Sequence, residues 1–282
     1  MGGMTLTSRR AVLSALAAAA VAGPAAAGAT ATPAHAAGDS DAYRSNSDLY
    51  TRLAGQEGVQ FGRRYRRHGY ADGSESLGYP YHRTTVMALH GGGVEMGTSE
   101  LCLAIAGYHP KTLAPLQDGR GAHDYWMFEG LRSSGNSELH VTSTNCDDRV
   151  ALSMAASSLN VLSLHGCTAA QAGTVPRAVV VGGRSTRFRS LLKAEFDTVG
   201  IAWRDGSEVP ALAGVDPDNP CNRTMLGKGG QLELTTELRA AMFAVNTRAG
   251  RAGSTTDLFD DFVGACRAAI ARLEQDPEQA VL

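Results

Sequence analysis

The chain has 282 residues, 43% of them hydrophobic, which supplies enough apolar material for one substantial core and fits a single α/β domain. The formal net charge is only −2, from 26 lysines and arginines against 28 aspartates and glutamates. This balance gives no global positive field, and the sequence has no acidic tail. The composition therefore argues against a nucleic-acid-binding protein.

Residues 1–36 differ in composition from the rest and predict an export signal. Arg9 and Arg10 precede a moderately apolar, alanine-rich run that ends in Ala34-His35-Ala36. This pattern is typical of a Tat-type signal peptide, so we expect a secreted protein. A transmembrane anchor is the alternative, but glycine, proline and threonine interrupt the run. Removal of this segment takes away two arginines, and the mature chain then carries a formal charge near −4 (−2 − 2).

The remainder of the chain divides into a polar lead-in and one domain. Residues 37–58 are rich in aspartate and serine, and we expect a loose segment with a short helix near Tyr50 to Leu53. Residues 59–282 are predicted to form a single catalytic α/β domain. No internal repeat or low-complexity linker interrupts them.

A basic stretch opens this domain, with Arg63, Arg64, Arg66 and Arg67 around Tyr65. The spacing fits a solvated strand or hairpin on the surface. It also fits a landing surface for a polyanionic substrate. The sequence leaves both interpretations open.

From residue 84 onward, short β-rich runs alternate with segments long enough for helices, which predicts a mostly parallel sheet with helices on its faces. The predicted strands are Thr84 to Leu89, Leu139 to Ser143, Asn160 to Leu164, Ala178 to Val181, and Gln231 to Thr235. The predicted helices are Thr98 through Ala106, with Thr98 as N-cap, then Arg187 to Phe196, and Thr256 to Glu274. The last one has a clear apolar stripe and is expected to close the domain.

Five cysteines in an exported protein allow two disulfides and leave one thiol, and the sequence does not choose the pairing. Their spacing contains no CxxC pair, so a structural zinc knuckle is not expected. The five are Cys102, Cys146, Cys167, Cys221 and Cys266.

Two predicted strands end in the same way, with His90-Gly91 and His165-Gly166. Ligands of an open α/β sheet bind outside the carboxyl ends of the strands, so these two histidines can converge on one point. Imidazole is the commonest metal ligand at neutral pH. A single histidine at a strand end is usually a packed, hydrogen-bonded residue, but the repetition favours a metal site.

A glycine-rich turn follows His90 and can curl the carboxylate of Glu95 back toward the histidine. Two histidines and one carboxylate, with a fourth position open to water, form the ligand set of a catalytic zinc ion. We therefore predict one Zn²⁺ bound by His90, Glu95 and His165. Glu100 is the alternative third ligand, although its position in a first helical turn suits an acid that complements the helix dipole.

Metal-assisted hydrolysis also needs a proton acceptor, and the last predicted strand offers Glu233. Leu232 and Leu234 point to one face of this strand, so Glu233 points to the other and can enter a polar site. A carboxylate there can take a proton from the attacking water and pass it to the leaving amine. An exposed strand residue is the alternative.

Three segments together resemble the poly-γ-glutamate hydrolase family. They are His90-Gly-Gly-Gly-Val-Glu-Met-Gly-Thr-Ser-Glu100, Ser163-Leu-His-Gly-Cys167 and Gln231-Leu-Glu-Leu234. The resemblance runs from about residue 60 to residue 275. It implies a mixed, mostly parallel central sheet flanked by helices, similar to that of the zinc metallocarboxypeptidases. Those enzymes place two residues between the first histidine and the glutamate, whereas four intervene between His90 and Glu95.

The same resemblance implies His90, Glu95 and His165 as the zinc ligands and Glu233 as the general base. The implied substrate is a polymer of glutamates joined through their side-chain carboxyls, with one free α-carboxylate per unit. Arg223, just ahead of the last predicted strand, is the expected partner for a substrate carboxylate or an oxyanion.

Three further residues are candidates to line the cleft: His123, Tyr125 and His140. His140, inside a predicted strand, also fits a packed, hydrogen-bonded residue.

Other functions remain open at this point. The same chemistry fits a peptidoglycan γ-glutamyl bond or an acylated glutamate. A secreted, non-catalytic binder of anionic polymers belongs to a different class, and the presence of every expected catalytic residue type argues against it. The sequence does not decide between endo- and exo-cleavage, between D- and L-glutamate, or among oligomeric states.

Overall fold

The computed structural model describes residues 41–69 and 83–279, so the predicted signal segment lies outside the described residues. The strands are β1 (Phe61–Arg66), β2 (Thr84–Gly92), β3 (Asp124–Gly130), β4 (Asn160–Cys167), β5 (Ala178–Gly182), β6 (Ala202–Asp205) and β7 (Gly230–Thr235). The α-helices are α1 (Asn46–Arg52), α2 (Thr98–Ile105), α3 (Arg149–Ala156), α4 (Ala169–Ala172), α5 (Thr186–Thr198), α6 (Thr236–Ala241) and α7 (Asp257–Glu274).

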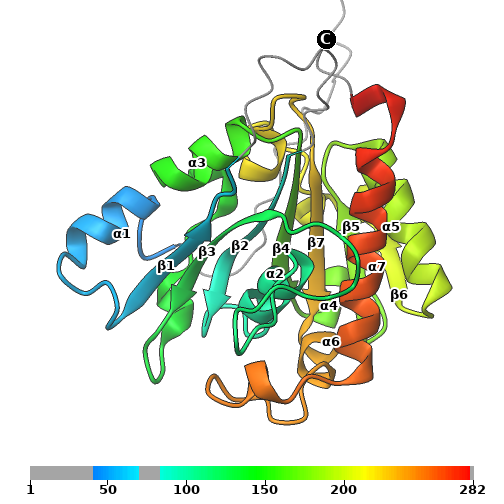
Figure 1. Cartoon of the computed structure of the whole chain (residues 1–282). Helices are drawn as coiled ribbons and strands as arrows, with labels where there is room; N and C mark the ends of the chain where they lie inside the picture. The colour runs from blue at the N-terminus through cyan, green and yellow to red at the C-terminus, as the bar shows by residue number, and fades with distance from the viewer. Residues whose placement is uncertain (1–40, 70–82, 280–282) are drawn as a thin grey trace, which may run out of the picture. The chain divides into compact units, whose positions relative to one another are not determined.

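The seven strands form one sheet in the order β1-β3-β2-β4-β7-β5-β6 (Figure 1). Strands β3, β2, β4 and β7 run parallel to one another. β1 is antiparallel to β3, and β5 is antiparallel to β7 and parallel to β6. This arrangement confirms the predicted fold class, a mixed, mostly parallel sheet flanked by helices.

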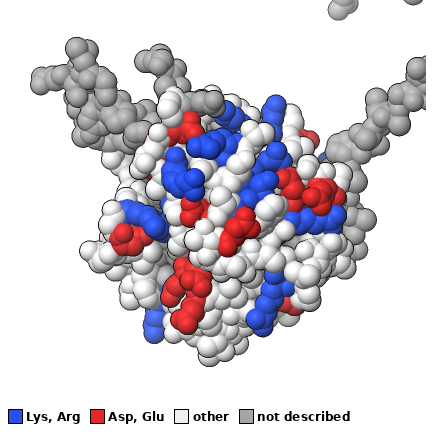
Figure 2. All heavy atoms as spheres, turned by 90° about the vertical axis from the view of Figure 1, so that its right-hand side faces the viewer, with Lys and Arg blue, Asp and Glu red and all other residues white. Residues whose placement is uncertain are grey.

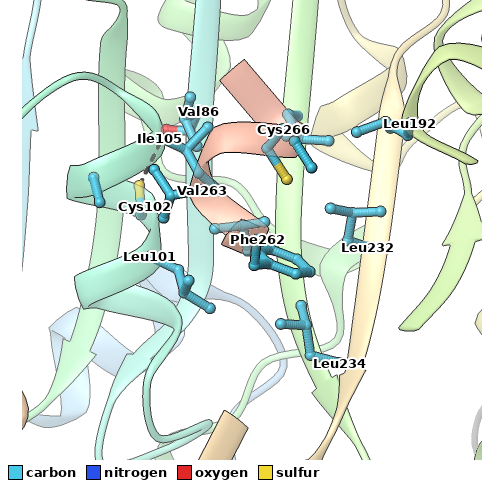
Figure 3. Close-up of a cluster of buried hydrophobic side chains, with 14 of the residues drawn as sticks. Val86, Leu101, Cys102, Ile105, Leu192, Leu232, Leu234, Phe262, Val263 and Cys266 are labelled. Carbon is cyan, nitrogen blue, oxygen red and sulfur yellow. Dashed lines mark hydrogen bonds between the residues drawn. The ribbon is translucent and has the colours of Figure 1, made fainter. Parts of the chain in front are cut away.

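The strands carry different side chains on their two faces, and this alternation positions the functional site. Leu232 and Leu234 of β7 are fully buried in the larger core, together with apolar residues of α2, α5 and α7. Figure 3 shows Phe262 and Cys266 of α7 in this cluster. The opposite face packs against α1 and α3. Because Glu233 lies between the two leucines, it points away from the larger core, as predicted.

One predicted strand and one predicted helix cap are wrong. Leu139 ends a 3-10 helix, and a second begins at Ser143, so no strand runs between them. Leu139 and Val141 are nevertheless buried, because this irregular segment packs on the core instead of pairing with a strand. At α2 the N-cap is Gly97, with φ of 98°, and Thr98 is the first helical residue. The sequence interpretation also left β3 without an assignment.

The disulfides allowed by the cysteine count are not formed, because all five cysteines are free and buried. They are divided among separate apolar clusters: Cys102 and Cys266 belong to the larger core, Cys146 and Cys221 to the core on the opposite face, and Cys167 to a third cluster. Burial raises the pKa of each thiol. The cysteines thus act as small apolar core residues.

The basic stretch forms the edge strand β1, and its arginines have partners in the chain. Arg63 pairs with Glu57 at 2.8 Å and with Asp148 at 3.2 Å. The guanidinium of Arg66 lies 5.0 Å from the ring centroid of Tyr108. These contacts favour the interpretation of a surface strand over that of a substrate landing surface.

Charges of both signs are interspersed on the face that includes α5 and α7 (Figure 2). Arg272 pairs there with Glu195 at 2.5 Å, and Lys193 with Asp205 at 2.7 Å. In the part of the chain that the structure describes, no helix combines the length and the apolar character that crossing a membrane requires.

Candidate metal centre

The three predicted metal ligands converge at the carboxyl ends of the central strands. His90 lies near the end of β2, His165 near the end of β4, and Glu95 in the turn before α2. Their ligand atoms all lie within 4.8 Å of one another. The two Nδ1 atoms are 3.1 Å apart, and His90 Nδ1 is 3.0 Å from Glu95 Oε1.

The second nitrogen of each ring is already occupied. His90 Nε2 donates to the carbonyl oxygen of Val141 at 2.8 Å, and His165 Nε2 is 2.9 Å from Ser163 Oγ. A carbonyl can only accept, so in the neutral ring the lone pair of His90 is on Nδ1. Glu95 Oε1 and His165 Nδ1 lie 3.0 Å and 3.1 Å from this nitrogen. A cation would satisfy all three, so the residues fit a bound metal ion.

Strand geometry explains why these side chains meet. His165 of β4 is aligned with Glu233 of the neighbouring β7, so both point to the same side of the sheet. In β2 the pairing with β3 shifts register between Ala88 and Gly91. Such an irregularity can re-aim a side chain, and here it spans His90.

Arg239 joins the turns that carry the ligands. Its buried guanidinium donates to the carbonyl oxygens of Met96, at 2.8 Å, and Leu234, at 3.2 Å. A Cβ at Gly166 would lie 2.6 Å from Arg239 Cζ, so glycine after His165 makes room for the arginine. The backbone N–H of Gly166 donates to Glu95 Oε2 at 2.8 Å. Arg239 was not singled out from the sequence.

Glu100, the alternative third ligand, is engaged elsewhere. Its Oε1 accepts from Nε of the fully buried Arg251 at 3.0 Å. The same guanidinium donates to the carbonyl oxygen of Gly92 at 3.2 Å. The Glu100–Arg251 pair therefore holds the glycine-rich turn, while Glu95 occupies the position beside the histidines.

Glu233 is 7% exposed and faces the same pocket as the metal ligands. Gln231 Nε2 donates to Glu233 Oε1 at 2.9 Å, and Gln231 Oε1 accepts from Asn219 Nδ2 at 2.8 Å. Burial and the nearby charge of Glu95 raise the pKa of Glu233 well above its ordinary value. A buried carboxyl group with a raised pKa is suited to general acid–base chemistry.

Without a cation, the titration of the three ligands is strongly perturbed. Burial alone would lower the pKa of His90, but the charge and hydrogen bond of Glu95 outweigh it and raise the pKa, which favours a protonated ring. Burial lowers the pKa of His165 to about 3. Burial alone would raise the pKa of Glu95, but the charge and hydrogen bond of His90 outweigh it and lower the pKa to about 2. Perturbation of this kind is typical of functional sites.

A pocket of about 520 Å³ opens over the ligand group. Beyond the predicted residues, its wall includes hydroxyl and amide side chains of Ser137, Thr142, Thr144 and Gln171. His140, predicted as a candidate to line the cleft, does line this pocket, and so does Asp41, to which the sequence assigned no chemistry. They are 99 residues apart, so their pairing has no short-range sequence signal.

The structure does not bring three other candidates to this pocket. Arg223 is exposed and follows a 3-10 helix (Pro220–Asn222) ahead of the amino end of β7, whereas Glu233 lies toward its carboxyl end. His123 lies 3.6 Å from Glu274, and Tyr125 is buried in the larger core.

Comparison with known proteins gives consistent results. The family model described as "Poly-gamma-glutamate hydrolase" matches residues 77–265. Two Bacillus subtilis (strain 168) proteins are similar: the SPbeta prophage-derived protein YoqZ is 33% identical over 181 residues, and YndL is 30% identical over 177 residues. The alignments cover 64% and 63% of this chain. The chain spans 59% of YoqZ and 63% of YndL, less than two thirds of either.

Two solved structures are also similar. A bacteriophage poly-γ-glutamate hydrolase matches with a TM-score of 0.67 and 30% identity, over 83% of this chain and 98% of the phage chain. A structure of YndL described as apo and zinc-free matches with a TM-score of 0.66 and 26% identity, over 83% and 99%.

We predict that Gly166→Ala destabilises the protein by about 1–3 kcal/mol, because the added methyl overlaps the guanidinium of Arg239. Urea denaturation of the two proteins measures this difference. Gly264→Ala is the matched control: Gly264 lies inside α7 with open space around its Cα, so alanine should stabilise by about 0.5–1 kcal/mol. Equal effects of the two substitutions would contradict the close approach of Arg239.

Proposed function

Because the chain belongs to the poly-γ-glutamate hydrolase family, a family of enzymes, we propose that it is a zinc-dependent hydrolase of γ-glutamyl amide bonds, with poly-γ-glutamate as its substrate. The proposed zinc dependence rests on one observation: the Nδ1 atoms of His90 and His165 lie 3.1 Å apart beside Glu95. The pocket over this group contains Glu233, which supports hydrolysis as the reaction.

His90, Glu95 and His165 would hold one zinc ion. Two histidines and one carboxylate with an open fourth position are the ligand set of catalytic zinc sites. When bound there, zinc would polarise the scissile carbonyl and activate a water molecule. The hydrogen bonds from His90 Nε2 to Val141 and between His165 Nε2 and Ser163 hold both rings in the orientation that binding requires.

Glu233 would transfer the proton. Its carboxylate accepts a proton from the attacking water and delivers it to the amide nitrogen that leaves. Gln231 holds one carboxylate oxygen in place, which leaves the other for this transfer. The raised pKa of Glu233 favours the return of the proton to the leaving group.

The hydroxyl and amide groups of the pocket wall would bind the substrate. Thr142, Thr144 and Gln171 can each donate a hydrogen bond to a free α-carboxylate of the glutamate chain. The exposed position of Arg223 does not support the role that we expected for it.

We predict that the metal-free protein takes up one equivalent of zinc and that the double variant His90→Ala/His165→Ala takes up none. Isothermal titration after treatment with a chelator measures the stoichiometry. His123→Ala removes a histidine outside the pocket and should keep the full equivalent. Retention of one equivalent by the double variant would disprove the metal site.

We predict that Glu233→Gln lowers kcat on poly-γ-glutamate by about 10²–10⁴-fold while zinc binding is retained, because the amide cannot accept the proton. Chain length followed on a gel, together with a zinc assay, tests this. Glu237→Gln, an exposed change on α6, is the control and should leave the activity unchanged. Undiminished cleavage by Glu233→Gln would remove the assigned base.

The wild-type protein in the same assay tests the substrate. If the zinc-loaded wild type leaves poly-γ-glutamate intact, the proposed substrate is wrong. The alternatives are then a peptidoglycan or acyl-glutamate amide as substrate, or a protein that binds anionic polymers without turnover.

We also propose that the protein acts outside the cytoplasm, on the basis of the twin arginines Arg9 and Arg10 and the sequence Ala34-His35-Ala36. The full chain expressed in a host with a Tat pathway should appear in the medium with residue 37 as its new N-terminus. Arg9→Lys/Arg10→Lys should keep it in the cells. Export of this variant at the wild-type level would contradict a twin-arginine signal.

A further inference from the structure

Asp41 lies beside the pocket in a segment to which the sequence assigned no chemistry. It precedes residues 77–265, which match the family model. Its carboxylate accepts two hydrogen bonds from the segment 140–142, one from a side chain and one from the backbone. Oδ1 accepts from His140 Nδ1 at 2.8 Å, and Oδ2 accepts from the backbone N–H of Thr142 at 2.6 Å.

These two contacts flank Val141, whose carbonyl oxygen accepts from His90 Nε2 at 2.8 Å. The ring of His140 also packs on that of His90, with 4.0 Å between centroids. Asp41 thus holds the residues on both sides of the atom that orients His90. In the ligand group, it is His90 Nδ1 that faces both His165 and Glu95.

The stretch that Asp41 holds has no sheet to fix it. Residues 140–142 lie between two 3-10 helices and belong to no strand. His140 is in an extended backbone conformation. The side chain of Asp41 therefore supplies hydrogen bonds that a neighbouring strand would supply in the sheet.

Asp41 is itself held in place by the segment that follows it. Tyr43 is buried in the core on the α1 side, and the guanidinium of Arg52 donates to the carbonyl oxygen of Ala42 at 2.7 Å. Leu49 of α1 is fully buried. Burial alone would raise the pKa of Asp41, but the hydrogen bonds from His140 and Thr142 outweigh it and lower the pKa, which keeps the group charged.

We infer that Asp41 is a positioning residue for the metal centre, acting through His140 and Val141 on the zinc ligand His90. The inference rests on the zinc-dependent function proposed above and extends it to a residue outside the family match. Outer partners of metal-binding histidines fix the ring orientation, and their loss typically weakens metal binding by about 10–100-fold.

The test measures zinc affinity by competition with a chromophoric chelator, which does not depend on activity. Asp41→Ala removes both acceptors, and we expect zinc to bind about 10-fold more weakly. Asp41→Asn keeps one acceptor in the same shape, and we expect a smaller loss in the same direction. Asp48→Asn is the matched control, because it removes an acid from the same segment. Asp48 accepts from the backbone N–H of Arg44 and pairs with Arg52 at 3.6 Å, and among the described residues it is not part of the pocket wall, so zinc affinity should not change.

Thermal unfolding of the metal-free proteins separates positioning from general destabilisation. We expect the stabilisation by added zinc to be smaller in both Asp41 variants than in wild type and in Asp48→Asn. If Asp41→Ala fails to fold, the isosteric Asp41→Asn decides. If the wild-type protein binds zinc and cleaves its substrate, and the Asp41 variants bind zinc with the same affinity as the wild type, this inference alone is overturned. A wild type that binds no zinc would overturn the proposed function first.

Discussion

The site depends on two ring nitrogens, Nδ1 of His90 and Nδ1 of His165, that lie 3.1 Å apart beside the carboxylate of Glu95. The carbonyl oxygen of Val141 accepts from His90 Nε2, so a neutral His90 has its lone pair on Nδ1, and Ser163 Oγ contacts His165 at its Nε2. The arrangement is electrostatically unfavourable unless a positive charge or a proton lies between the nitrogens. The surrounding structure must therefore hold His90 and His165 close together, and several buried polar groups do this.

Two buried arginines supply much of that support. Arg239 connects the turn after Glu95 with the end of β7, and Arg251 connects the glycine-rich turn with Glu100. Each of them donates to a backbone carbonyl at or near the end of a strand, Leu234 of β7 for Arg239 and Gly92 of β2 for Arg251, and so links a strand end to the turns beside it. They fix loops whose glycines would otherwise permit many conformations.

The sequence predicted the parts of the site that repeat or alternate. The two His-Gly strand ends and the alternation around Glu233 depend on local geometry, and the structure places those side chains as predicted. Arg223 illustrates the limit, because nearness to a strand in sequence does not determine which end of the strand a side chain reaches. Asp41 and Arg239 act through contacts that span 99 and 143 residues, which no local pattern reveals. The segment 139–143 has a strand-like composition, but its apolar residues pack on the core without pairing.

The free, buried cysteines have a consequence for how the fold is maintained. Because no disulfide links any two of the five cysteines, no cross-link lowers the conformational entropy of the unfolded chain. The stability of the native state then comes from the packing of the sheet and its helices. A reductant has no bond to attack in such a protein, and an oxidant meets thiols that are shielded from solvent and held in their protonated form. In the folded chain the five thiols therefore serve packing, and burial suppresses their reactivity.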